Sequence, residues 1–534
     1  MLFTSYEFIL FAAALILVYY LIPARFQWML LLAGSWIFYA VAGIGYLPYL
    51  LVTCITVYFT ALQIERVHTR QKVYLKEHKA ELSREERKTY QAQQKKVRSR
   101  LLVLCLILNI GILAVVKYAN FFLSNVNALL SLTGSTAQLS FLSLAMPMGI
   151  SFYTLQAIGY LLDVNRETVK AERNFFRFAL FVSFFPQLVQ GPISRFGDLS
   201  KTLYVPHRFD TDTICKGLQR VLWGYFKKMV IADRILTGVT EIIGSPGVYR
   251  GAYVFAGMLL YTLELYADFT GGIDITIGLA QTLGITVQEN FEQPYFSRSL
   301  KEYWRRWHIS MCSWFRDYIF YPLSISGAMR SLGKWVGKHF GKAASRRVPV
   351  YVSTFVVWFA TGIWHGASWN FIIWGLANCA VLLISEELEP LYARFHGRFP
   401  TLAQNSLYRI FQTLRTFLLV CCLNLFDCYA SIAETAGAFL SMFTVHNWGI
   451  LTDGSLLNLG LSALDYGITA FGVIVMFLVS FLQVKEPGVS VRGRVAALPY
   501  AGRFVIWFGL FLLVLLLGAY GIGYDASQFI YNQF

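Results

Sequence analysis

Long apolar runs recur along this chain, and they constrain its fold more than any other feature of the sequence. Four clear examples are residues 101–116, 350–360, 371–384 and 504–520, and basic segments lie between the runs. With their flanks, such runs are long enough to cross the hydrocarbon core of a bilayer. Because backbone polar groups in that core need partners within the protein, the spanning segments are expected to be helical. The sequence therefore predicts an all-α polytopic membrane protein.

Basic residues gather between the apolar runs, and their distribution predicts the topology. Segment 65–100 is polar and helix-favouring, with twelve Lys/Arg residues against five Glu, and we expect it to form a cytoplasmic hairpin. Placing the basic loops on the cytoplasmic side gives about eleven transmembrane helices with both termini outside. The same rule accounts for most of the net charge of +16, so no nucleic-acid partner is expected.

Two apolar segments are interrupted by residues that break helices. Residues 145–154 contain a Pro and a Gly, and we expect a broken helix there. Residues 178–191 are short and are followed by basic sequence that includes Arg220, Lys227 and Lys228. Because both flanks then face the cytoplasm, we interpret residues 178–191 as a re-entrant or interfacial segment, which must be buried in protein or line a wet cavity.

His365 stands at the join between two of the apolar runs, in the stretch Thr361–Trp369. An ionisable side chain is costly in hydrocarbon, so by default it marks a functional site. Gly362 and Gly366 flank the histidine and permit either a backbone bend or the close approach of another chain or ligand. We therefore interpret His365 as the reaction centre of the protein.

A second histidine lies in a dense aromatic stretch, residues 300–322. At helical spacing, this stretch predicts one continuous amphipathic helix at the membrane interface. His308 falls on its apolar side, so both a functional and a structural role stay open for it. The apolar face contains Trp304, Trp307, His308, Met311, Trp314, Phe315 and Tyr318, and the polar face contains Arg305, Arg306, Ser310, Ser313 and Asp317.

Three carboxylates, those of Glu264, Asp268 and Asp274, lie in or beside apolar sequence. Glu264 and Asp268 are four residues apart and share a helix face. Paired intramembrane charges are often architectural, so a structural polar core is favoured over direct catalysis. The eight cysteines form no CxxC motif, and neither a disulfide framework nor a metal site is predicted.

Several short motifs follow one another along the chain. They are Pro186-Gln187, Asp268-Phe269-Thr270-Gly271, Glu289-Asn290-Phe291, Trp304-Arg305-Arg306-Trp307-His308, Trp364-His365-Gly366, Trp369 and Trp374-Gly375. Together they resemble the signature of the membrane-bound O-acyltransferase (MBOAT) family, and the chain is most similar to the bacterial branch that O-acetylates exopolysaccharides such as alginate. The resemblance implies the MBOAT fold, with N-terminal spans in 1–137, a catalytic core in 138–387 and C-terminal spans in 388–534.

The resemblance implies acyl transfer to a hydroxyl, carried out in the bacterial cytoplasmic (inner) membrane. His365 is then the general base, and His308 is a second histidine that orients substrate or meets the donor from the cytoplasmic side. Acetyl-CoA is the expected donor, with no tightly bound cofactor. The expected partners are membrane lipid, an extracytoplasmic polysaccharide and a periplasmic or extracellular acetyltransferase. Candidate substrate- or donor-binding residues are Trp364, Trp369, Arg305, Arg306, Asn290 and Asp317.

Alternative functions stay open at this point. One is D-alanyl transfer to teichoic acid, which belongs to the enzyme class. The other is a non-catalytic transporter or scaffold for polymer export. A transporter is expected to carry charged residues in several spans and a repeated half, and neither feature is clear in the sequence.

Overall fold

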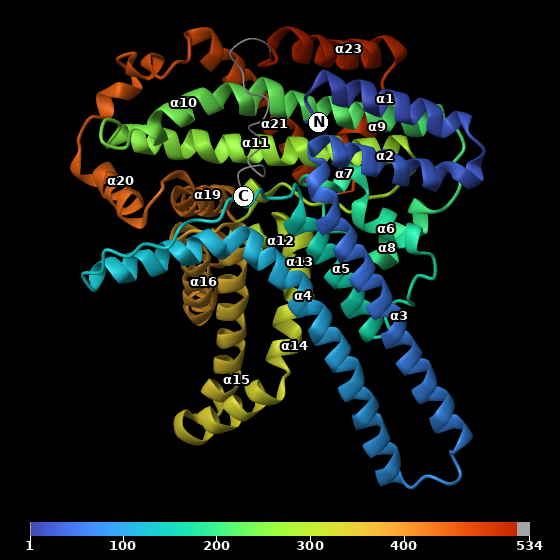
Figure 1. Cartoon of the computed structure of the whole chain (residues 1–534). Coiled ribbons are helices and arrows are strands. Elements are labelled where there is room, and N and C mark those ends of the chain that lie inside the picture. Colours follow the sequence, from blue (N-terminus) through green and yellow to red (C-terminus); the bar gives the residue numbers. More distant parts are fainter. Residues whose placement is uncertain (1, 487, 521–534) are drawn as a thin grey trace. The chain divides into compact units, whose positions relative to one another are not determined.

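The structure, a computed structural model, describes residues 2–486 and 488–520, and this part of the chain contains helices but no strand (Figure 1). Seven of its helices are long and apolar enough to cross a membrane, and α1 (Tyr6–Leu21) is a shorter apolar helix. These findings confirm the predicted all-α polytopic class. The predicted count of about eleven passes stays a prediction. The predicted outer position of the C-terminus falls on residues 521–534, outside the described residues.

The chain divides into two compact units, which we describe separately. The first comprises residues 1–214 and 279–287, and the second comprises residues 215–278 and 288–534. The predicted divisions after residues 137 and 387 fall inside these units and stay predictions. Helices of the first unit are α1, α2 (Gln27–Ala42), α3 (Leu47–Glu77), α4 (Arg84–Leu132), α5 (Ile150–Asn165), α6 (Phe175–Ser183), α7 (Phe185–Leu188) and α8 (Phe196–Leu203).

Helices α3 and α4 form a long hairpin in the first unit (Figure 1, blue), and segment 65–100 is its tip. Ser83 starts α4 with a capping box: its hydroxyl accepts from the Glu86 N–H at 3.2 Å, and the Glu86 carboxylate accepts from the Ser83 N–H at 2.8 Å. Two backbone donors at the helix start are thereby satisfied. The segment thus forms a helical hairpin, as its helix-favouring composition predicts.

The two interrupted segments of the first unit are irregular, and the second of them is buried. Helix α5 begins only after Gly149, which has a φ of 68° and lies so close to Leu188 that any Cβ atom would overlap the Leu188 carbonyl oxygen. Residues 178–193 are buried and consist of α6 and α7 with a break between them. The broken helix predicted near Gly149 is wrong: a helix starts there, because residues 135–147 before it are not helical. The irregular backbone around Pro186 is enclosed by protein, as it must be at membrane depth.

The second unit holds the remaining helices, including most of α9 and α11, and two short π-helical segments at Phe226–Ala232 and Arg316–Phe320. Its helices are α9 (Thr211–Tyr225), α10 (Asp233–Gly244), α11 (Ala252–Thr282), α12 (Leu300–Arg306), α13 (Ile309–Phe315), α14 (Tyr321–Ser324), α15 (Gly327–His365), α16 (Trp369–Glu387), α17 (Glu389–Arg398), α18 (Pro400–Gln404), α19 (Ser406–Cys428), α20 (Ile432–Thr444), α21 (Ala463–Lys485), α22 (Val491–Ala496) and α23 (Tyr500–Leu517).

A glycine seam joins α9 to α11 in the second unit. A Cβ atom on Gly224 would lie 2.6 Å from the Gly271 carbonyl oxygen, and one on Gly278 would lie 2.8 Å from the Gly217 carbonyl oxygen. Small residues at such positions let the backbones of two membrane helices approach closely. The seam therefore holds α9 and α11 close together, so that the side chains between the glycines of one helix face those of the other.

We expect Gly224→Ala to destabilise the second unit, because its new methyl group meets backbone that cannot move away cheaply. Overpacking of this kind costs about 1–3 kcal/mol, which thermal unfolding in detergent measures as a lower midpoint. Gly244→Ala at the end of α10 is the matched control, since nothing lies within 4 Å of its Cβ position. Equal midpoints for the two variants would contradict the seam.

Candidate functional site

His365 is the last residue of α15 and faces the start of α16, which Ser368 caps. The two helices cross at glycines: a Cβ on Gly362 would lie 2.5 Å from the Phe371 carbonyl oxygen, and one on Gly375 would overlap the Trp358 carbonyl oxygen. Of the two roles open for Gly362, the structure therefore shows close approach. This crossing fixes the partly buried imidazole beside the first turns of α16.

Three tryptophans hold the site together. The His365 ring lies 4.7 Å from the Trp374 ring, which in turn packs on Trp304 at 5.6 Å and on Trp358 at 6.2 Å. The Trp304 indole also donates a hydrogen bond to Asn378 Oδ1 at 3.1 Å. Edge-to-face packing at these separations is favourable beyond simple burial. Helix α12, which carries Trp304, is thereby attached to α15 and α16.

The continuous amphipathic helix predicted for residues 300–322 is wrong. The stretch breaks at Trp307 and His308 into α12 and α13, and it continues through the π-helical segment Arg316–Phe320. His308 has φ 46° and ψ 52°, a left-handed conformation that non-glycine residues rarely adopt. The break turns Ser310, predicted on the polar face, into a buried residue.

Asn290 provides the physical reason for this break. Its carbonyl accepts from the Ile309 N–H at 3.0 Å, and its side-chain Oδ1 accepts from the Ser310 N–H at 3.0 Å and from the Ser310 hydroxyl at 2.9 Å. The next segment pairs with α12, since the Glu292 N–H donates to the Arg306 carbonyl at 2.9 Å. Asn290 thus supplies partners to backbone groups at the start of α13 that a helix leaves unpaired.

His308 is fully buried beside the same tryptophan that adjoins His365. Its ring lies 4.9 Å from Phe269 and 6.0 Å from Trp364, and the Trp364 ring lies 5.1 Å from His365. Burial, followed by the proximity of His365, holds the pKa of His308 well below its usual range. His308 is therefore a neutral imidazole at physiological pH, separated from His365 by one indole.

Buried ion pairs lie next to this aromatic site. Lys228 Nζ is 2.5 Å from Asp268 Oδ1 and 2.7 Å from Asp233 Oδ1, and Asp268 directly precedes Phe269. The Lys228 and Asp268 side chains are 2% and 0% exposed. Glu264 is buried one turn before Asp268. The two carboxylates predicted to share a face of α11 therefore do so in the protein interior.

A second set of ion pairs involves Asp274. Arg220 Nε donates to Asp274 Oδ1 at 2.8 Å, and the two terminal nitrogens of Arg220 contact the Glu289 carboxylate at 2.5 and 2.6 Å. Lys227 Nζ lies 2.6 Å from Asp274 Oδ2 and 2.8 Å from Thr270 Oγ1. The assignment of Lys227 and Lys228 to a basic cytoplasmic flank is wrong, because both side chains are buried in ion pairs.

The other predicted site residues lie in different surroundings. Trp364 is buried between the two histidines, whereas Trp369 is exposed at the start of α16. Arg305 is exposed, Arg306 pairs with Glu302 at 2.7 Å, and Asp317 pairs with Arg316 at 3.0 Å. The structure thus brings Trp364, His308 and His365 together and leaves Trp369, Arg305, Arg306 and Asp317 outside this group.

Sequence reasoning missed several residues of the site. Phe269 and Phe291 contact each other at 4.8 Å, and Phe291 lies 4.9 Å from Trp307. Their motifs were visible in the sequence, but their packing around His308 follows from contacts between distant segments. Among the described residues, no group of three or more His, Cys, Asp or Glu side chains is placed to hold a metal ion.

Comparisons with known proteins agree on one family. The sequence model of the membrane-bound O-acyltransferase family matches residues 170–426. That range contains His308, His365 and the ion pairs of Asp268 and Asp274.

Named relatives resemble half of the chain or more. The chain is 31% identical over 521 residues to the probable alginate O-acetylase of Pseudomonas aeruginosa, which covers 94% of this chain and 88% of that protein. It is 30% identical over 405 residues to the peptidoglycan O-acetyltransferase of Helicobacter pylori, covering 70% and 66%. Similarity to the teichoic acid D-alanyltransferase of Bacillus subtilis is lower, at 26% over 281 residues, covering 51% and 66%.

Proposed function

Because this chain belongs to the membrane-bound O-acyltransferase family and is thus an O-acyltransferase, we propose that it carries an acetyl group across the membrane. The donor is a cytoplasmic acyl thioester, acetyl-CoA. The acceptor is a hydroxyl of an extracytoplasmic polysaccharide, or of a partner acetyltransferase that passes the group on. The proposed location is the bacterial cytoplasmic membrane, with the basic loops inside and the N-terminus outside.

One observation carries this proposal: two imidazoles flank the indole of Trp364 at the end of a membrane-length helix. His365 is partly buried and His308 is fully buried. In the proposal, the acceptor meets His365 and the donor meets His308 from the opposite side. The identities to an alginate O-acetylase and a peptidoglycan O-acetyltransferase support an acetyl group and a polysaccharide acceptor.

In the proposed step, His365 removes the proton of the acceptor hydroxyl while its oxygen attacks the thioester carbonyl carbon. A C–O bond forms and the carbonyl oxygen becomes an oxyanion, for which the indole N–H of Trp364 and backbone N–H groups are candidate donors. The C–S bond then breaks, and the His365 imidazolium returns the proton to the departing thiolate. One thioester and one alcohol give one ester and one thiol, without a redox change.

The acyl group on the exported polymer tests this function directly. Polymers from cells with and without the gene are treated with mild alkali, and the released acids are identified by chromatography. We expect acetate that disappears when the gene is deleted and returns when it is restored. Release of D-alanine instead would assign the chain to teichoic acid modification, and no difference in either acid would remove the proposed acetyl transfer.

His308→Asn and His308→Ala separate the ring of His308 from its backbone conformation. Asn tolerates the left-handed region, whereas Ala there is strained by roughly 1–2 kcal/mol. We expect His308→Asn to keep more of the unfolding midpoint than His308→Ala but to lower the rate of acetyl transfer by about tenfold or more, since the imidazole beside Trp364 positions a reactant. His308→Ala should lower both quantities. A wild-type rate in His308→Asn would make the role of His308 structural.

A further inference from the structure

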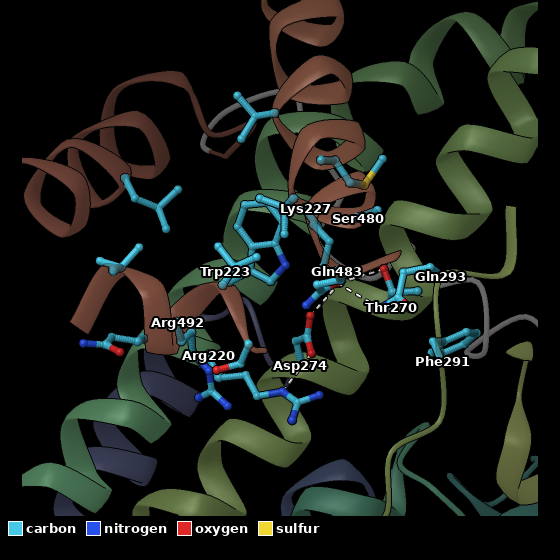
Figure 2. Close-up of a pocket in the computed structure, with 18 of the residues that line it drawn as sticks. Arg220, Trp223, Lys227, Thr270, Asp274, Phe291, Gln293, Ser480, Gln483 and Arg492 are labelled. Atoms are coloured by element: carbon cyan, nitrogen blue, oxygen red, sulfur yellow. Dashed lines mark hydrogen bonds and ion pairs between the residues drawn. The ribbon is translucent and has the colours of Figure 1, made fainter. Parts of the chain in front are cut away.

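A cavity of about 590 Å³ lies in the second unit, between α9, α11, α21, α22 and α23 (Figure 2). Its size falls within the range of small-molecule sites, about 300–1,000 Å³. One part of its wall is polar and another is apolar, so it suits an amphiphile. The apolar wall is formed by Val475, Val479, Ile506, Leu510 and Leu513.

The polar wall of the cavity carries equal numbers of positive and negative groups. They are Arg220, Lys227, Arg492, Asp274, Glu289 and Glu292. Arg220 and Lys227 are held by Asp274 and Glu289, as described above, and Figure 2 shows Arg220, Arg492 and Asp274 in one part of the wall. A ligand with several phosphates would face three carboxylates here. A headgroup with one phosphate and one ammonium matches both signs.

The apolar wall is separated from the surface of the unit by a single helix. Helix α23 packs on the segment Phe226–Ala232 and on α22, and none of its residues is buried. A membrane-length helix with such exposure faces lipid over much of its surface. The apolar side of the cavity therefore lies at the depth of acyl chains, with its polar side next to the basic segment around Arg492.

We propose that this cavity binds one membrane phospholipid with a zwitterionic headgroup, such as phosphatidylethanolamine, and that an acyl chain lies between α21 and α23. The lipid phosphate contacts Arg492, and its ammonium contacts Glu289 and Glu292. Helices α21–α23 lie beyond residues 170–426, the part matched by the family model. The site is therefore formed jointly: the family core supplies most of its charged groups, and the C-terminal part of this chain supplies Arg492 and most of the apolar wall.

The proposed lipid lies close to the reaction site but does not enter it. Phe291 and Tyr266 line the cavity, and their rings lie 4.9 and 6.3 Å from Trp307. Phe269 contacts both Phe291 and His308. A layer of aromatic rings thus separates the lipid from His308. A bound lipid supports the side of that layer that lines the cavity.

Two variants are designed to exclude the lipid from the cavity in different ways. Gly509→Phe places a ring in it, since nothing lies within 4 Å of the Gly509 Cβ position, and Gly467→Phe is its matched control on the exposed part of α21. Arg492→Ala removes the proposed phosphate contact. Arg494→Ala is its control, because Arg494 shares α22 but does not line the cavity.

The measurement is native mass spectrometry of the purified full chain, after reconstitution in nanodiscs of phosphatidylethanolamine or of phosphatidylglycerol. We expect one phosphatidylethanolamine per wild-type chain, about tenfold lower occupancy in Gly509→Phe and Arg492→Ala, and wild-type occupancy in both controls. Equal retention by all variants, or equal binding of phosphatidylglycerol, would overturn the proposal. Displacement of the lipid by acetyl-CoA would instead identify the cavity as the donor site.

Discussion

Replacing His365 by Ala is expected to abolish acetyl transfer while the protein still inserts into the membrane. General acid–base catalysis contributes about 10²–10⁴ in rate, and the proposed step uses this one imidazole both to take the hydroxyl proton and to return it to the thiolate. Acetate released from the exported polymer measures the loss, and the amount of full-length protein in the membrane fraction reports insertion.

His339→Ala is the matched control, because His339 lies in α15 before its kink at Gly341, is exposed and is distant in sequence from the crossing of α15 and α16. It should leave polymer acetylation at the wild-type level. Polymer acetylation that persists in His365→Ala would remove His365 from the mechanism, whatever the result for His308.

Replacing Lys228 by Met is expected to cause the largest loss of stability. The change leaves Asp268 and Asp233 without the cation that lies 2.5 and 2.7 Å from them. Breaking a buried ion pair by removing one partner costs about 3–5 kcal/mol, because an uncompensated charge stays buried. Thermal unfolding in detergent should therefore show a much lower midpoint, and the yield of folded protein should fall.

Two further variants show whether charge or shape causes this loss. Lys228→Met combined with Asp268→Asn removes one of the two stranded charges, that of the fully buried Asp268, and should recover part of the midpoint. Lys201→Met removes a cation from an exposed pair with Asp198 at 2.9 Å, and such pairs contribute little. If Lys228→Met unfolds at the wild-type midpoint, the buried ion pair is not a structural element of the core.

The fold class was predictable from the sequence because it depends on the length of apolar runs, a local property. The break at His308 was not, since helical spacing in residues 300–322 is regular. The groups that start α13 are satisfied by Asn290, which lies eighteen positions before His308 in the chain. A pattern within one segment cannot report a hydrogen-bond partner supplied by another.

The candidate site was predictable in part. His365 was identified from the cost of an imidazole between apolar runs, and the structure places it beside Trp364, as adjacency requires. Lys227 and Lys228 were misassigned, because a lysine in a basic flank and a lysine paired with a buried carboxylate look the same in one sequence. Two of the carboxylates that pair with them, Asp268 and Asp274, are on α11, at least forty residues away.

We propose above that the acetyl group passes from one side of the membrane to the other at His365. Purified protein is reconstituted in sealed liposomes, radiolabelled acetyl-CoA is placed on the side of the basic loops, and an acceptor oligosaccharide is placed on the other side. We expect labelled ester on the opposite side for the wild type and none for His365→Ala. Labelled ester that forms only when donor and acceptor share a side, or that forms equally in both proteins, would contradict it.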